Sequence, residues 1–185
     1  MFLLILTILE SFLAGLETRV LSSDLTIQVT EQSASQPLSY TGNVTMLGER
    51  FLINAFGAQA AYDGKTLYVY NEDLDEMTLS TPSRAELIDS NPLLYARELS
   101  KVCNITERDS KNGKETIITL TPKDRSAGIS RFVLRVEKET LLPRSIEVTE
   151  HKRTTLIRLL HPTYSTTKPD FRIETPQGAY VNDLR

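Results

Sequence analysis

Short segments in which apolar and polar residues alternate are the feature that most constrains the fold of this chain. Leu25, Ile27 and Val29 alternate with polar residues, which is typical of a strand with one buried face. The same period of two returns later in the chain, at residues 40–46, 129–137 and 144–149. Turn signals such as Asp63-Gly64 and Lys111-Asn112-Gly113 join successive segments as hairpins. Consecutive hairpins favour an antiparallel sheet over alternating β and α units.

Helical patterns occur at the start and in the middle of the chain. Leu9, Phe12 and Leu16 fall on one helical face, in a helix that we expect to begin near Thr7. One or two short helices are predicted between Pro82 and Lys101. A sheet of about eleven strands usually curls. We therefore predict a mainly β (α+β) fold: an incomplete, strongly curved antiparallel β-barrel with an N-terminal helix and a short helical lid over its concave face.

An apolar run opens the chain and ends at Glu10. The run is too short to span a bilayer as a helix, and it lacks the basic start and the small-residue cleavage site of a complete signal peptide. We interpret residues 1–6 as the remnant of a signal peptide and residues 7–185 as one domain, as the length suggests. A cytosolic helix with an apolar start is the alternative.

Nothing in the sequence indicates catalysis. Positive and negative charges are interspersed and the net charge is −3, so no basic stripe for nucleic acid is present. Cys103 is the only cysteine, and His151 and His161 lack the spacing of metal ligands. No Gly-x-Ser-x-Gly elbow or phosphate-binding glycine loop occurs. We predict a protein that is not an enzyme, with no catalytic residue, metal or cofactor.

Apolar residues on the inward faces of the expected strands are abundant instead. A filled core and a hollow that accepts acyl chains are both consistent with such alternation. If the hollow exists, its candidate lining residues are Leu25, Ile27, Val44, Met46, Phe51, Ile53, Leu67, Val69, Phe132 and Leu134. Phe51 opens the third expected strand, so we place it near the rim of the hollow.

Two blocks at opposite ends of the chain resemble the LolA family, whose members carry lipoproteins across the bacterial periplasm. Residues 63–71 are an Asp-Gly turn followed by an aromatic strand, and residues 171–183 begin with an expected strand that stops at a Pro-x-Gly turn. The strand at Phe51 and the segment 120–123 add to the resemblance, which covers most of the chain. Details such as Asn91-Pro92 resemble the members from Bacteroidetes-like bacteria.

The resemblance implies a function of binding rather than catalysis. A monomeric periplasmic carrier would shield lipoprotein acyl chains in its cavity. It would receive them from an inner-membrane ABC release complex and deliver them to an outer-membrane acceptor. Proteobacterial members carry an Arg-Pro pair after the second strand, where the arginine latches the lid. Arg50, in Gly48-Glu49-Arg50, is the candidate latch here. An envelope sensor or adaptor, or a carrier of another lipid or glycolipid, are the alternatives.

Overall fold

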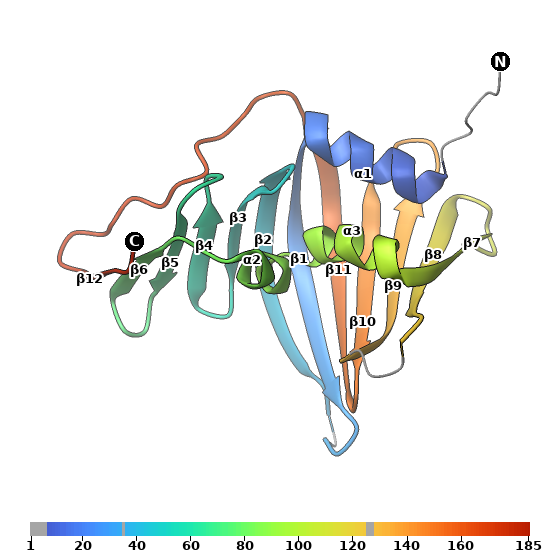
Figure 1. Ribbon diagram of the computed structural model, residues 1–185, viewed down its shortest axis with the longest axis horizontal. Coiled ribbons are helices and arrows are strands. Elements are labelled where there is room, and N and C mark those ends of the chain that lie inside the picture. The colour runs from blue at the N-terminus through green and yellow to red at the C-terminus, as the bar shows by residue number, and fades with distance from the viewer. Residues whose placement is uncertain (1–6, 35, 125–127) are drawn as a thin grey trace.

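The computed structural model describes residues 7–34, 36–124 and 128–185, in which three helices lie on one face of a twelve-stranded sheet (Figure 1). The predicted signal-peptide remnant, residues 1–6, lies outside the described residues. The helices are α1 (Ile8–Thr18), α2 (Arg84–Ser90) and α3 (Pro92–Val102). The strands are β1 (Val20–Glu31), β2 (Leu38–Leu47), β3 (Arg50–Ala55), β4 (Ala58–Tyr62), β5 (Leu67–Asn71), β6 (Glu76–Ser80), β7 (Cys103–Asp109), β8 (Glu115–Pro122), β9 (Ile129–Glu137), β10 (Pro143–Glu150), β11 (Arg153–Ser165) and β12 (Tyr180–Asp183).

The sheet is open, with the strand order β12-β6-β5-β4-β3-β2-β1-β11-β10-β9-β8-β7. Neighbouring strands are antiparallel, as the hairpin signals predicted, except that β12 pairs with β6 in parallel. The predicted curved, incomplete barrel with an N-terminal helix and a short helical lid is therefore confirmed in its architecture. The expected hairpin at Asp63-Gly64 joins β4 to β5, and Gly64 adopts a φ of 104° that favours glycine.

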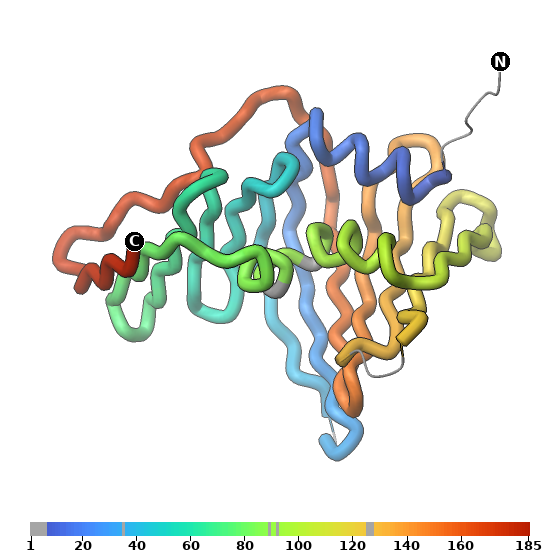
Figure 2. The backbone as a smooth tube through the Cα atoms, viewed as in Figure 1, coloured from blue at the N-terminus to red at the C-terminus, as the bar shows by residue number. Residues whose placement is uncertain are grey.

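One predicted strand is wrong. Residues 170–175 form no strand, and the last strand of the chain, β12, comes ten residues after Asp170. The segment lies against the sheet instead, because Phe171 is buried against Val20, Leu47 and Leu52 on the face of the sheet opposite the helices. Residues 166–179 thus cross the sheet to reach β6, and we call them the C-terminal strap (Figure 2).

Helix α1 begins within one residue of the expected position. Thr7 is its N-cap, and the Thr7 hydroxyl accepts from the backbone N–H of Glu10 in a capping box. The Glu107 carboxylate, on edge strand β7, also accepts from the backbone N–H groups of Ile8 and Leu9. These bonds satisfy donors that a helix start leaves unpaired, and they fix α1 across the β8–β7 end of the sheet.

The helices and the sheet share one apolar core. Leu9, Phe12 and Leu16 of α1 meet sheet residues from β1 to β4 and from β8 to β11 in a single buried cluster. We call this side of the sheet the covered face and the opposite side the outer face. Gly42 permits a close approach within the sheet, since a Cβ there would lie 2.1 Å from the Asn54 carbonyl oxygen.

Candidate functional site

The covered face carries two apolar rows that cross several strands. In one row, Tyr40 of β2 lies opposite Ile27 of β1, and Ile27 lies opposite Ile157 of β11. In the next row, nearer the tips of the long strands, Leu38 lies opposite Val29, which lies opposite Thr155. The second row ends on an exposed residue, because Leu38 is 61% exposed. The apolar face therefore continues toward the strand tips beyond the buried core.

Nine of the ten predicted lining residues belong to one cluster on the covered face. Six are buried inside it: Leu25, Ile27, Met46, Phe51, Phe132 and Leu134. Three are half-buried against it: Val44, Ile53 and Leu67. Val69 is half-buried on β5, where it pairs with Ala60 and Thr78. Their role in lipid binding stays a prediction, because the helices occupy the space in front of most of them.

Phe51 does not lie at a wet rim, as its place at the start of a strand suggested. Its side chain is 0% exposed and its ring centroid lies 6.1 Å from that of Tyr62. The rim position was inferred from the nearby turn, but α1 covers that turn: the Gly48 N–H donates to the Leu16 carbonyl at 2.7 Å. Phe51 is thus part of the packed interior.

A groove of about 410 Å³ opens between the short helices and the sheet. Ile88 of α2 and Tyr95 of α3 form one wall, and Val148 and Ile157 form the other. The Tyr95 ring meets Phe132 of the core edge-on, with centroids 6.3 Å apart. We call this groove the mouth. None of the four wall residues was predicted from the sequence, although Val148 lies in the segment 144–149 whose alternation predicted a strand.

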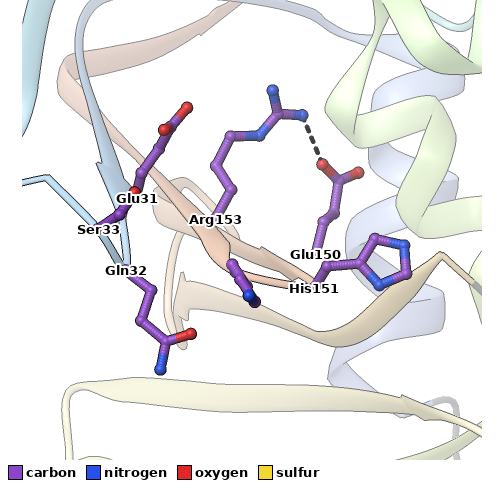
Figure 3. A pocket seen from close by; sticks show the side chains of 7 residues that line it. Glu31, Gln32, Ser33, Glu150, His151 and Arg153 are labelled. Atoms are coloured by element: carbon purple, nitrogen blue, oxygen red, sulfur yellow. Dashed lines mark hydrogen bonds and ion pairs between the residues drawn. The ribbon is translucent and has the colours of Figure 1, made fainter.

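A charged pair borders the mouth at the strand tips. Glu150 and Arg153 line the mouth and also a second, polar pocket of about 370 Å³ beside it. Figure 3 shows the ion pair between them, at 2.7 Å, with Glu31 and His151 around it. An amphipathic ligand at this place would have its apolar part against the mouth and its polar part against this pair.

Ion pairs at the protein surface hold the helical lid, α2 and α3. The Arg84 guanidinium on α2 bridges Glu49, in the β2–β3 turn, at 2.5 Å and Glu98 of α3 at 2.6 Å. Arg97 of α3 pairs with Glu17 of α1. Such exposed pairs stabilise by up to about 1 kcal/mol each. The lid is therefore fastened weakly by charge, and its main attachment is apolar.

The charges of the lid shift the pKa values of their own carboxylates. Hydrogen bonds from Lys101 and then from Arg84 lower the pKa of Glu98. Hydrogen bonds to Glu98 and Glu49 raise the pKa of Arg84 in turn. Glu98 and Arg84 are therefore both charged at neutral pH, and the ion pairs of Glu98 weaken when acid protonates it.

Arg50, the candidate latch, lies on the outer face. Its guanidinium carbon lies 5.3 Å from the centroid of the Phe171 ring in the C-terminal strap. Strand alternation explains this position, since Phe51 points to the core and Arg50 points away from it. The residue of this turn that contacts the lid is the adjacent Glu49. A latch role for Arg50 stays a prediction.

The two sequence blocks that carry the family resemblance contact each other where the strap passes Asp63. Asp63 accepts from the backbone N–H groups of Lys65 and Thr66 at 2.9 and 2.8 Å, and from the Tyr68 hydroxyl at 3.2 Å. Arg172 of the strap lies 3.3 Å from the same carboxylate. Burial by itself would raise the pKa of Asp63, but these donors outweigh it and lower that pKa.

Within the described ranges, no group of three or more His, Cys, Asp or Glu side chains is arranged to hold a metal ion. None of the helices in the described part of the chain has the length and apolarity needed to cross a bilayer.

The sequence model of the family described as "Outer membrane lipoprotein carrier protein LolA" matches residues 59–173, more than half of the chain. This protein belongs to the LolA family. The match includes Asp63, the lid, the mouth and Phe171 of the strap. No curated protein matches the sequence at a significant level.

Solved structures share the fold at low sequence identity. An uncharacterized conserved protein from Thermus thermophilus is 11% identical with a TM-score of 0.61, and the alignment covers 95% of this chain and 96% of that one. A LolA superfamily protein from Nitrosomonas europaea is 12% identical with a TM-score of 0.42, covering 91% and 99%. A putative outer membrane lipoprotein-sorting protein domain from Vibrio parahaemolyticus is 9% identical with a TM-score of 0.43, covering 88% and 93%. The first of these supports the fold and carries no information on cargo.

Proposed function

We propose that this protein is a periplasmic carrier that shields the acyl chains of lipoproteins on its covered face and ferries them from the inner to the outer membrane. The observation that carries the proposal is the apolar mouth, which lies where a weakly fastened lid meets an apolar face larger than the lid covers. Family membership supports the same function, which is binding without catalysis. An inner-membrane release complex and an outer-membrane acceptor are the partners this function requires.

The energetics of the lid suit a carrier that must both load and release. Four leucines of the lid are buried: Leu87, Leu93, Leu94 and Leu99. At about 1.5–3 kcal/mol each, their burial contributes roughly 6–12 kcal/mol. One 16-carbon acyl chain gains roughly 12 kcal/mol on leaving water, at ~0.8 kcal/mol per CH₂. The free energy of replacing the lid leucines by an acyl chain is therefore close to zero. Modest differences in partner contacts then suffice to drive cargo in or out.

The volume of the mouth supports a lid that moves when cargo binds. About 410 Å³ lies at the lower end of the range for a single small ligand, roughly 300–1,000 Å³. A lipoprotein with several acyl chains needs more space than this. The chains would enter beside Ile88 and displace α2 and α3 from the sheet, while the Glu150–Arg153 pair remains at the polar end of the mouth.

A release assay tests the proposal. The protein is incubated with inner-membrane vesicles that hold a triacylated lipoprotein, and the soluble lipoprotein–carrier complex is measured. Val148→Glu places a charge in the mouth and should abolish the complex, because the carboxylate would be desolvated against an acyl chain. Thr149→Glu is the control, since it puts the same charge on the same strand but on the outer face.

A complex that forms equally with both variants, or with a lipoprotein that lacks its acyl chains, contradicts the proposal. Native mass spectrometry of the protein isolated from its own cells is a second test. Bound lipoprotein supports the carrier. A bound glycolipid or other free lipid would instead identify a carrier of that lipid.

A further inference from the structure

A basic groove of about 430 Å³ lies on the outer face, across strands β7 to β11. Five arginines line it: Arg108, Arg131, Arg135, Arg144 and Arg158. The described helices pack on the opposite face, and the strap contacts the sheet at the β1–β3 region instead. The groove is therefore open to solvent.

Positive charge is concentrated at this groove. Its lining holds the five arginines against two carboxylates, Glu115 and Glu147, although the whole chain carries a net charge of −3. A third carboxylate, Glu137, pairs with Arg144 at 2.9 Å. A local field opposite in sign to the net charge attracts anionic groups to one place on the surface. The groove thus differs from the mouth on the covered face, whose walls are apolar.

The strand register spaces three of the arginines evenly. Arg108 of β7 lies opposite Ile117 of β8, which lies opposite Arg135 of β9. Arg135 lies opposite Ser145 of β10, which lies opposite Arg158 of β11. With neighbouring strands about 4.8 Å apart, successive arginines are roughly 10 Å apart and the row extends roughly 19 Å.

The arginines at the two ends of the row are available to a ligand. Arg135 lies 3.5 Å from Glu115, and Arg131 lies 3.8 Å from Glu147. Among the described residues, no ion pair is found for Arg108 or for Arg158, which donates to the neutral Gln28 side chain at 2.8 Å.

The floor of the groove between the arginines is apolar and buried. Ile117 is 4% exposed and Val133 is 7% exposed, although no described helix covers them. The aliphatic stems of the arginines are the groups placed to cover this floor, which directs their guanidinium groups outward.

We propose that this groove binds an extended acidic segment of a partner protein. A single phosphate cannot contact both ends of a row about 19 Å long, whereas an extended chain of about six residues spans roughly 20 Å. An extended chain follows a single row of charges, whereas a planar membrane surface would contact charges spread over an area. Guanidinium forks bind carboxylates in a bidentate manner, as they do phosphates. This inference is independent of the cargo that the covered face holds.

Fluorescence anisotropy of the full chain with a labelled eight-residue peptide of alternating Glu and Gly tests the proposal. Binding should weaken steeply with added salt, and the same peptide with Gln in place of Glu should not bind. The double variant Arg108→Gln/Arg158→Gln should bind the acidic peptide roughly tenfold more weakly. Lys65→Gln/Lys152→Gln has the same net charge and should bind within about twofold of the wild type. Circular dichroism and the Tm establish that each variant is folded.

Removing an internal competitor should strengthen binding. Glu147→Gln frees Arg131 and should tighten the complex about two- to threefold, while Glu174→Gln, with the same change in net charge, should not. The proposal is overturned if both double variants lose binding equally, or if the acidic peptide does not bind at millimolar concentration. Binding of phosphatidylglycerol vesicles through Arg108 and Arg158 that the peptide fails to displace also overturns it, in favour of a membrane contact. Displacement of the peptide by millimolar inorganic phosphate would overturn it in favour of a simple anion site.

Discussion

The lid and the C-terminal strap cross opposite faces of the same sheet, and different side-chain contacts attach them to it. The strap is anchored by Phe171, which is 2% exposed, and by the Asp63–Arg172 contact. Two exposed ion pairs, Arg84–Glu49 and Arg97–Glu17, join the lid to the rest of the molecule. One buried aromatic ring attaches the strap, whereas four buried leucines attach the lid, and an acyl chain can replace those leucine contacts.

This difference also separates the residues that identify the family from those proposed to bind cargo. The sequence blocks around Asp63 and Phe171 carry the resemblance to LolA, and they meet each other at the strap. The mouth is built by Ile88, Tyr95 and Val148, which belong to neither block. The recognisable residues therefore determine the architecture, while the residues that would touch cargo are ordinary apolar ones.

The largest effect is expected when the strap loses its anchor. Phe171→Ala should lower the free energy of unfolding by about 3–5 kcal/mol, the range for a buried aromatic side chain. Phe56→Ala is the control and should change it by less than about 1 kcal/mol, since Phe56 is 58% exposed. Urea unfolding measures both. Equal effects of the two substitutions would show that the strap is not an anchor.

The hydrogen bonds to Asp63 should make stability depend on pH. These donors lower the pKa of Asp63 in the folded protein, so its contribution is present above the ordinary aspartate value near 3.9 and is lost as the pH falls through the lower, folded value. Asp63→Asn should cost about 1–2 kcal/mol at pH 7. It should also flatten the fall in unfolding free energy below about pH 4. An unchanged acid slope in the variant would assign that slope to other carboxylates.

Loss of the Arg84 ion pairs should change the dynamics of the lid and hardly change the free energy of unfolding. Arg84→Gln removes both ion pairs, so we expect a loss of less than about 1 kcal/mol. Hydrogen exchange of the α2 and α3 amides should nevertheless become faster, with no change at β12. Unchanged exchange in the helices would mean that apolar contacts alone close the lid. A matched loss of protection at β12 would mean that lid and strap open together.

Much of the fold follows from the sequence, because alternation and turn residues are local signals. The hairpins at Asp63-Gly64 and at residues 111–113 formed where the turns predicted them, and two short helices lie between Pro82 and residue 102. Phe171 was misassigned to a strand, because a segment can bury a side chain against the sheet without pairing its backbone.

The candidate site was less predictable. Nine of the ten predicted lining residues lie in the cluster on the covered face, yet alternation cannot show how far the helices extend over it. Phe51 was therefore placed at the rim although it is fully buried, and the mouth at Ile88 and Tyr95 was missed. Arg50 and Glu49 are neighbours in sequence that point to opposite sides, and only the register of β3 decides which of them meets the lid.

The central claim is that acyl chains bind on the covered face at the mouth. The chain contains no tryptophan, so a single introduced Trp reports its own surroundings by fluorescence. Val148→Trp and Thr149→Trp place that reporter on opposite faces of one strand. With a triacylated lipopeptide whose chains carry bromine, the account predicts strong quenching for Val148→Trp and none for Thr149→Trp. Equal quenching of both variants, or quenching of Thr149→Trp alone, would contradict it.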